Sequence, residues 1–441
     1  MNEIENFWNR NRLLIKGGTI AVLTLLLLIP SALITSLIYE RQNRQEEARK
    51  EVSSHWASSQ ALCGPVLVIP YVDTQAKEEK KLAYFLPQDL IVNGSMLPEK
   101  RYRGIYEVML YRSEVTVQGS FAAPDLAGLK LDPGQMLWKE AYVMLGLTDL
   151  RGVDEQAALR WNDTSYLFDP GLPSNALLQS GMQVSLTNET NASLAGGARF
   201  SFHLLLKGSQ SFDLIPVGKT TQVKLRSSWP TPSFTGEFLP SSRSISAAGF
   251  GADWKVYNLN RNYPQAWKDA SYDLLKSAFG VSLMVPVDMY QKTMRCVKYA
   301  ILFIALTFLV FFLLESVYGG RVHPFQYLLI GLALCIFYVL LLSISEFLHF
   351  VPAYIIASSA TAALISVYTL GLFKKRVLSL LVGGMLLLLY GFIFILIQLE
   401  DFALLMGSIG LFIILGIVMY FSRKIDWYQS QTTEQPVIRT E

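Results

Sequence analysis

The hydrophobic residues of this chain are concentrated near its two ends. Residues 298–421 are almost wholly apolar and are interrupted only by short polar segments. A run of roughly 18 or more apolar residues can cross the hydrocarbon core of a bilayer, whereas a buried helix of a soluble protein keeps a polar face. The pattern therefore predicts a transmembrane domain over 299–421 with five helices, at residues 299–317, 327–343, 351–373, 377–397 and 403–421.

A sixth apolar run lies at the N-terminus. Residues 1–16 contain Arg10, Arg12 and Lys16, and residues 17–38 are apolar. A cleaved signal peptide has the same order of charged and apolar residues, but its apolar core is usually about 7–15 residues long and ends in small residues. The longer run predicts an uncleaved transmembrane anchor.

The residues between these hydrophobic regions, 39–298, follow a different pattern. Apolar and polar side chains alternate in short runs separated by turn residues, which is typical of antiparallel strands with one buried face. Strands are expected at 66–72, 81–86, 90–94, 141–147, 182–187, 199–207, 211–217, 220–227, 244–257 and 280–287. The prediction is an α+β membrane protein with six transmembrane helices and a large, β-rich, sandwich-like domain outside the membrane.

Three stretches of this region predict other local structure. The long alternating stretch 103–121 indicates two paired strands. Residues 40–61 favour a charged helix that Gly64-Pro65 brings to an end, and 264–276 is the one later helix candidate.

The basic residues beside the predicted spans all fall on one side of the membrane. If the N-terminus is inside, the inner segments hold Arg10, Arg12, Lys16, Arg321, Lys374, Lys375, Arg376, Arg423 and Lys424. The two short outer loops, 345–350 and 398–402, contain Glu346, Glu400 and Asp401 and neither Lys nor Arg. Because Lys and Arg are enriched in cytoplasmic loops, we expect both termini, including the tail 422–441, to lie in the cytoplasm.

Charge and composition exclude several classes of function. The net charge is +3, and no run of Lys and Arg is dense enough to follow a phosphate backbone, so nucleic-acid binding is not expected. Three cysteines are too few for a disulfide framework, and only Cys63 and Cys296 lie outside the predicted spans. The four histidines lack the spacing of metal ligands, and nucleophile and nucleotide-binding motifs are missing. We therefore expect no metal, no cofactor and no enzymatic activity.

Two carboxylates, Glu315 and Glu346, are the ionisable side chains closest to the predicted hydrocarbon. A carboxylate in lipid is costly unless it is protonated, paired or hydrated, so each is a candidate for function. Each also lies near the end of a span, where it can reach the water of the headgroup region. A purely structural role stays open for both.

Residues 228–240 form the densest unexplained stretch of the chain. They combine three prolines, one glycine and the aromatic residues Trp229, Phe234 and Phe238, which predicts a rigid loop with large apolar side chains. Such a loop can cap the core of the β domain, or it can expose a recognition patch, since aromatic residues dominate binding hot spots.

Several strings of this chain resemble the CreD family of bacterial inner-membrane proteins, also called cell-envelope integrity proteins. The most specific string is Ser228-Trp229-Pro230-x-Pro232-Ser233-Phe234-x-Gly236-x-Phe238-Leu239-Pro240. The others are Gly64-Pro65-x-x-x-Ile69-Pro70, Gly104-Ile105-Tyr106, Asp149-Leu150-Arg151-Gly152, residues 298–308, residues 323–332 and Ile425-Asp426-Trp427-Tyr428. Together they cover nearly the whole chain.

This resemblance implies a multi-pass inner-membrane protein with a periplasmic domain. It further implies production under a two-component envelope-stress regulon and links with envelope integrity, colicin tolerance and the β-lactam response. The resemblance identifies no catalytic residues in this chain. The family has Ser-Glu-His where this chain has Ser345-Glu346-Phe347, with a histidine only at His349, so a joint Glu–His role is not carried over.

Our leading hypothesis is a non-enzymatic envelope protein that binds an envelope component through Trp229, Phe234 and Phe238. The alternative is a lipid or glycan carrier, or an envelope-modifying enzyme, built on the transmembrane helices with Glu346 as its charged group. The expected partners are the lipid bilayer and an envelope protein, lipid or glycan.

Overall fold

The fold is taken from a computed structural model, which describes residues 12–73, 79–173, 179–187, 189, 191–268, 272–283, 289–318, 322–399 and 402–423. The chain divides into two compact units, one formed by residues 1–44 with 287–441 and the other by residues 45–286. Some residues used in the sequence-based topology lie outside the described residues, namely Arg10, Arg321, Glu400, Asp401, Lys424 and the rest of the C-terminal tail.

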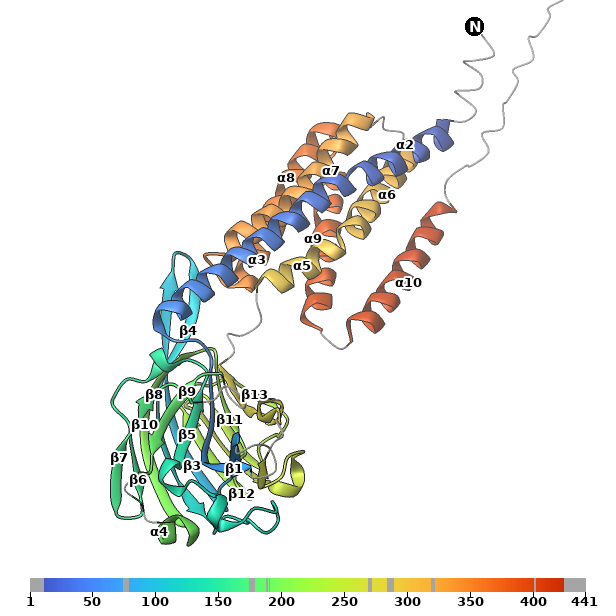
Figure 1. Cartoon of the computed structure of the whole chain (residues 1–441). Coiled ribbons are helices and arrows are strands. Elements are labelled where there is room, and N and C mark those ends of the chain that lie inside the picture. Colours follow the sequence, from blue (N-terminus) through green and yellow to red (C-terminus); the bar gives the residue numbers. More distant parts are fainter. Residues whose placement is uncertain are drawn as a thin grey trace, which may run out of the picture. The chain divides into compact units, whose positions relative to one another are not determined.

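The first unit is helical. It contains α2 (Arg12–Leu26), the beginning of α3 (Leu28–Trp56), α5 (Met289–Lys298), α6 (Ala300–Tyr318), α7 (Pro324–Ser345), α8 (Phe350–Phe373), α9 (Arg376–Gln398) and α10 (Ala403–Ser422) (Figure 1). Five stretches of the described residues are long and apolar enough to cross a membrane, and the pair α5 and α6, bent by 44°, makes a sixth if it is one span. The predicted anchor and five C-terminal spans are thus confirmed as helices.

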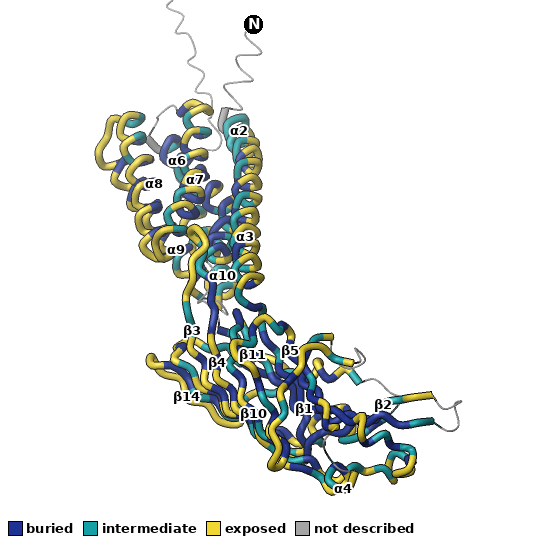
Figure 2. The backbone as a smooth tube through the Cα atoms, turned by 60° about the vertical axis from the view of Figure 1, so that its left-hand side comes forward, coloured by how far each residue is buried: buried dark blue, intermediate teal, exposed yellow. Residues whose placement is uncertain are grey.

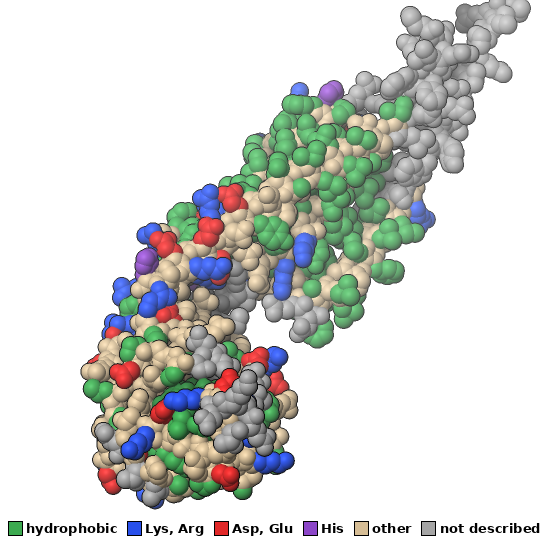
Figure 3. Space-filling view, viewed as in Figure 1, with side chains coloured by type: hydrophobic (Ala, Val, Ile, Leu, Met, Phe, Trp, Pro, Cys, Tyr) green, Lys and Arg blue, Asp and Glu red, His purple; other side chains and the backbone are tan. Residues whose placement is uncertain are grey.

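Helix α8 packs against α7 and α9, and its buried face contains small side chains besides Tyr354, whose ring contacts both neighbours. Ala353, Ala357 and Thr361 recur once per turn on one face of α8, and all three are buried. Small residues let helices approach closely in lipid, where burial of apolar surface gives no driving force. The outward faces keep long aliphatic side chains, and Figure 3 shows hydrophobic side chains covering the helices.

The second unit is built from two β-sheets around one continuous hydrophobic core. The nine-stranded sheet has the order β13-β17-β11-β1-β5-β9-β8, with β2 beside β1 and β16 beside β2. The eight-stranded sheet has the order β14-β15-β12-β3-β4-β10-β6-β7. Each sheet contains one parallel pair, β1 with β11 and β3 with β12, so both are mixed rather than purely antiparallel. The predicted β-rich, sandwich-like domain is confirmed.

The bounds of the elements in this unit are as follows. The strands are β1 (Gln60–Asp73), β2 (Glu79–Phe85), β3 (Asp89–Arg103), β4 (Tyr106–Phe121), β5 (Tyr142–Leu147), β6 (Ala158–Trp161), β7 (Thr164–Leu167), β8 (Asp169–Pro170), β9 (Gly181–Ser185), β10 (Ala198–Ser209), β11 (Ser211–Ile215), β12 (Thr220–Ser227), β13 (Pro232–Gly236), β14 (Ser242–Ser246), β15 (Gly249–Tyr257), β16 (Ala266–Lys268) and β17 (Phe279–Leu283). Helix α4 (Asn191–Ala195) and five short 3₁₀ helices lie between them. In Figure 2, buried residues follow β1 while β14 is exposed along its length.

Two predictions about strands and helices are wrong. The stretch 103–121 is not a pair of strands, because it forms the single strand β4, which pairs with the preceding strand β3 on one side and with β10 on the other. Gly104, with a φ of +59°, makes the turn between them. The helix expected at 264–276 is also not formed: β16 pairs with β2, and the ring of Trp267 stacks on that of Tyr84 at 5.4 Å. Burying this aromatic pair outweighs the weak helical preference of the segment.

Two further predictions need correction near the ends of elements. Helix α3 ends at Trp56, and Gly64-Pro65 lies within β1, so this dipeptide does not terminate the helix. The segment 228–240 is not a loop throughout, because Pro232–Gly236 forms β13 at the edge of the nine-stranded sheet. Proline is tolerated as the first residue of an edge strand, where no ladder hydrogen bond is lost.

Candidate functional site

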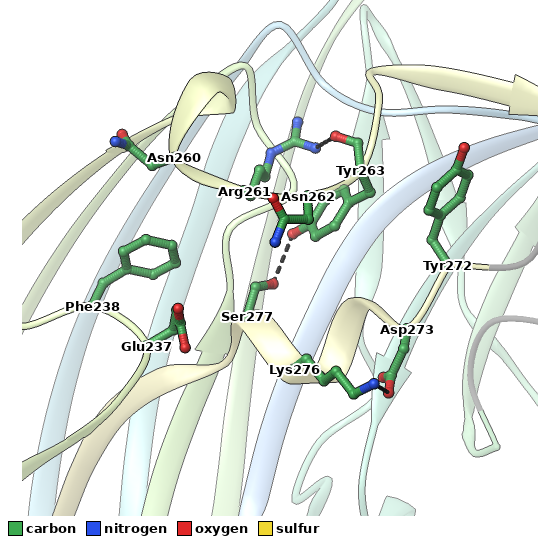
Figure 4. Close-up of a pocket in the computed structure, with 10 residues that line it drawn as sticks. All are labelled: Glu237, Phe238, Asn260, Arg261, Asn262, Tyr263, Tyr272, Asp273, Lys276 and Ser277. Carbon is green, nitrogen blue, oxygen red and sulfur yellow. Dashed lines mark hydrogen bonds and ion pairs between the residues drawn. The ribbon is translucent and has the colours of Figure 1, made fainter.

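The β unit contains a pocket of about 450 Å³ between the loops that follow β13 and β15 and the segment that leads into β17. Its walls come from three stretches of the chain, which Figure 4 shows converging on one space. The lining residues are Glu237, Phe238, Asn260, Arg261, Asn262, Tyr263, Tyr272, Asp273, Lys276 and Ser277. This volume is in the range of small-molecule sites, roughly 300–1,000 Å³.

Gly236, the last residue of β13, sets the position of the first wall. Its φ is +96°, and a Cβ there would lie 2.2 Å from the carbonyl oxygen of Ala278, so only glycine fits. Just beyond it, the carbonyl of Phe238 accepts a hydrogen bond of 3.1 Å from Trp254 Nε1. The Phe238 ring packs edge-on against Phe279 at 5.8 Å. Phe238 is therefore held half-buried at the edge of the pocket.

Arg261 supplies a buried positive charge to the pocket, since only 7% of the residue is exposed. Its guanidinium donates to the carbonyls of Tyr263 at 2.7 Å and Val217 at 3.3 Å, and it lies 4.3 Å above the ring of Tyr263. Its Nε has no hydrogen-bond partner, and no carboxylate of the described residues forms an ion pair with it. Burial lowers the pKa of Arg261, but a guanidinium stays protonated at neutral pH.

Two hydroxyls, those of Tyr263 and Ser277, are buried beside Arg261. Their oxygens lie 2.9 Å apart, and each also contacts a backbone carbonyl, that of Pro216 at 3.2 Å for Tyr263 and that of Leu274 at 2.7 Å for Ser277. Burial raises the pKa of Tyr263 to about 12, so its hydroxyl stays neutral. Among the described residues the partners of the Ser277 hydroxyl are a phenol and a carbonyl rather than a general base, so it is not arranged as a nucleophile.

The rim of the pocket is polar and exposed. Asn260 and Asn262 present amide groups, and Lys276 Nζ lies 3.5 Å from an Asp273 carboxylate oxygen in an exposed pair. Glu237 is exposed at the opposite side of the pocket in Figure 4, and within the described ranges its carboxylate has no side-chain partner. Small-molecule sites are lined mostly by apolar side chains, so this lining is unusually polar, and its aromatic faces, amides and charges suit a polar ligand.

The three aromatic residues predicted at 228–240 do not act together. Trp229 is only 7% exposed, and its Nε1 donates to the carbonyl of Thr231 at 3.0 Å. Phe234 packs edge-on against both Phe250 and Trp254, at 5.7 Å from each. Trp229 and Phe234 therefore pack in or against the hydrophobic core of the β unit. Of the three residues, only Phe238 lines the pocket.

Both candidate carboxylates of the helical unit have partners. Glu346 follows the last residue of α7; one of its oxygens accepts a hydrogen bond of 3.2 Å from the Tyr290 hydroxyl and lies 3.8 Å from Arg41 Nε. Glu315 is buried, pairs with Lys16 and accepts a hydrogen bond of 3.2 Å from the Tyr327 hydroxyl. Partners of this kind are what a structural carboxylate near hydrocarbon requires.

The described residues contain no group of three or more His, Cys, Asp or Glu side chains that could hold a metal ion. All three cysteines are free and buried.

Comparison with known proteins places this architecture in a family. Residues 12–428 match the family described as "Inner membrane protein CreD". A curated relative with the same description, from Escherichia coli (strain K12), is 34% identical over 417 residues, covering 92% of this chain and 91% of the relative. The chain belongs to the CreD family. It is accordingly an inner-membrane protein with several spans, as its CreD-like strings predicted.

One CreD-like string, Asp149-Leu150-Arg151-Gly152, joins the end of α3 to the sheets. The Asp149 carboxylate accepts hydrogen bonds from Arg151 Nη2 at 2.7 Å and from the backbone N–H of Ser58 at 3.0 Å. A Cβ on Gly152 would lie 2.2 Å from Gln60 Nε2 and 2.4 Å from the carbonyl oxygen of Lys207. This string is therefore explained by packing and capping within the β unit.

Sequence reasoning missed most of the pocket. Arg261, Asn262, Lys276 and Ser277 lie on segments whose local pattern predicted nothing, or predicted a helix that does not form. The one usable signal was Phe238, in the most specific CreD-like string. A buried arginine cannot be recognised from its neighbours in sequence, because its burial depends on carbonyls contributed by distant loops such as that of Val217.

Proposed function

We propose that this protein supports the integrity of the cell envelope, and the response to envelope stress, by binding an envelope component in the pocket of its β unit. In this proposal both termini lie in the cytoplasm, the β unit lies in the periplasm, and no reaction is catalysed. Altered colicin tolerance and β-lactam response would then follow from loss of that binding.

The single observation that carries the proposal is the mixed lining of the pocket. Half-buried Phe238 and Tyr272 offer apolar ring faces, while the buried Arg261 and the exposed Asn262 offer hydrogen-bonding groups. The Ser277 hydroxyl is occupied by a phenol and a carbonyl. These features support recognition rather than bond-making.

A competing proposal puts the function in the helices, as a lipid or glycan carrier or an envelope-modifying enzyme. One observation favours it: the Glu346 side chain is only 9% exposed although it lies at the end of a span. Its pairing with Tyr290 and Arg41 is equally what a structural carboxylate requires.

The experiment that tests the binding proposal is photo-crosslinking in cells from a benzoylphenylalanine placed at Phe238 or at Asn262. Leu259, which is 91% exposed and is not part of the lining, is the matched control position. We expect a discrete adduct from the two pocket positions and none from the control. An adduct pattern identical at all three positions, or no adduct from either pocket position, would contradict the proposal.

A further inference from the structure

The pocket combines two charges that nothing in the described part of the chain neutralises, and they lie at different depths. The Arg261 guanidinium is buried without a carboxylate partner, and the Glu237 carboxylate is exposed at the rim without a cationic one. The Arg261 donors face only backbone carbonyls and the side-chain amide oxygen of Gln265, so this cation loses much of its hydration without a compensating charge. A ligand with an anionic group would supply that compensation.

The remaining lining matches a polyhydroxylated ligand. Asn262 and Asn260 carry amides that both donate and accept, although the amide oxygen Oδ1 of Asn260 already accepts from the backbone N–H of Tyr257 at 3.0 Å. Glu237 can accept from hydroxyls, and a carboxylate accepts only. The Phe238 ring, which points into the space between these groups in Figure 4, offers an apolar face. A sugar ring has hydroxyls around its edge and C–H groups on its face, so it uses both kinds of surface.

An acyl chain fits this lining poorly. It would bury the exposed Asn262 amide and the exposed Glu237 carboxylate against hydrocarbon, where neither would regain the hydrogen bonds that it makes with water. The lipid alternative is therefore disfavoured at this site.

We propose that the pocket binds a saccharide that carries a carboxylate. The sugar ring lies against Phe238, its hydroxyls bond to Asn262 and Glu237, and its carboxylate is directed to the buried end of the pocket beside Arg261. This inference rests on the proposed function of the same pocket and specifies the chemistry of its ligand.

The test is calorimetric titration of the full chain in lipid nanodiscs with two matched disaccharides. N-acetylglucosamine joined to N-acetylmuramic acid carries a lactyl carboxylate, and N,N′-diacetylchitobiose is its neutral counterpart. We expect the acidic disaccharide to bind at least about tenfold more tightly, the factor that one charge-assisted hydrogen bond supplies. A disaccharide of glucuronic acid and N-acetylglucosamine carries a uronate carboxylate in place of the lactyl carboxylate. Comparing the affinities of the two acidic disaccharides shows which kind of carboxylate the pocket prefers.

Variants connect the binding to the pocket. Phe238→Ala and Asn262→Ala should each weaken binding of the acidic disaccharide, whereas Leu239→Ala, at a neighbouring residue that is 71% exposed and outside the lining, should not. Arg261→Gln should abolish the preference for the acidic over the neutral disaccharide. If that variant does not fold, Phe238→Ala, Asn262→Ala and the comparison of the two disaccharides still test whether the pocket binds a carboxylated saccharide.

The outcomes separate this inference from the proposed function. Equal binding of both disaccharides, or binding of neither, overturns the carboxylated saccharide. If a pocket-specific adduct still forms in cells, the proposed function stands with another ligand. If binding is unaffected by Phe238→Ala and Asn262→Ala, the saccharide lies elsewhere and the inference is also overturned.

Discussion

At the scale of single residues, the clearest electrostatic feature of the β unit is the environment of Asp149. Its side chain is 9% exposed and accepts two hydrogen bonds from the Arg151 guanidinium, at 2.7 and 2.9 Å, besides the backbone N–H groups of Ser58 and Arg151. The Arg151 hydrogen bonds are the largest cause that holds the pKa of Asp149 down, at about 2 against an ordinary value of 3.8. The carboxylate is therefore stabilised in its charged form in the folded state.

We predict that Asp149→Asn destabilises the β unit at neutral pH but not in acid. Because the folded-state pKa lies below the unfolded value, the stabilisation is complete above about pH 4 and is lost as the pH falls toward about 2. The expected loss at pH 7 is on the order of 1–2 kcal/mol, less than the full shift implies, since Arg151 is exposed and water screens the pair. Tryptophan fluorescence during denaturation at several pH values measures it.

Asp163→Asn is the control for this prediction, because Asp163 is exposed and none of its side-chain atoms bonds to another described residue. It should leave stability unchanged at every pH. A destabilisation by Asp149→Asn that is equally large near pH 3 would show that the charge of Asp149 is not the cause.

At the scale of elements, Glu346 joins three helices of the helical unit. It lies at the end of α7, Tyr290 belongs to α5 and Arg41 to α3, and the hydrogen bond of 3.2 Å is closer than the ion pair of 3.8 Å. The hydrogen bond therefore holds α7 to α5 more firmly than the longer ion pair holds α7 to α3.

We predict that Glu346→Gln leaves envelope-stress tolerance unchanged. A glutamine keeps an oxygen that can accept from Tyr290, and it loses only the longer contact with Arg41. Growth under colicin and β-lactam challenge is the measurement, with membrane levels of the protein compared by immunoblot. Loss of tolerance at a normal protein level would instead support the carrier or enzyme proposal.

At the scale of the whole molecule, the order of spans along the chain determines which segments share a side of the membrane. If α5 and α6 together form one span, the chain has six spans and returns to the side on which it began; the β unit follows the first span along the chain. The distribution of Lys and Arg beside the spans favours a cytoplasmic position for both ends.

We predict that a cysteine introduced at Leu239 is labelled in spheroplasts by a maleimide that cannot cross the inner membrane. A cysteine introduced at Ser430 in the C-terminal tail should be labelled only after the membrane is permeabilised. Leu239 is 71% exposed, and the three native cysteines are buried, so the background should be low. Labelling of the Ser430→Cys variant in sealed spheroplasts would reverse the proposed topology.

The sequence by itself determined the elements that depend on local pattern. In lipid every backbone group must bond within its own helix, so an apolar run of sufficient length specifies a span without reference to the rest of the chain. Strand β12 begins and ends where its alternation predicted, at Thr220 and Ser227, because burying one face of a strand imposes a period of two.

Which strands pair and which side chains share a site was decided only by the tertiary structure. The parallel pairing of β1 with β11 joins segments far apart in the chain, and nothing in either strand specifies its partner. Trp229 and Phe238 occur in one string, yet the first is buried and the second lines a pocket. Arg261 is part of a site because carbonyls of Val217 and Tyr263 surround it. Burial and proximity arise from non-local packing, and sequence pattern is local.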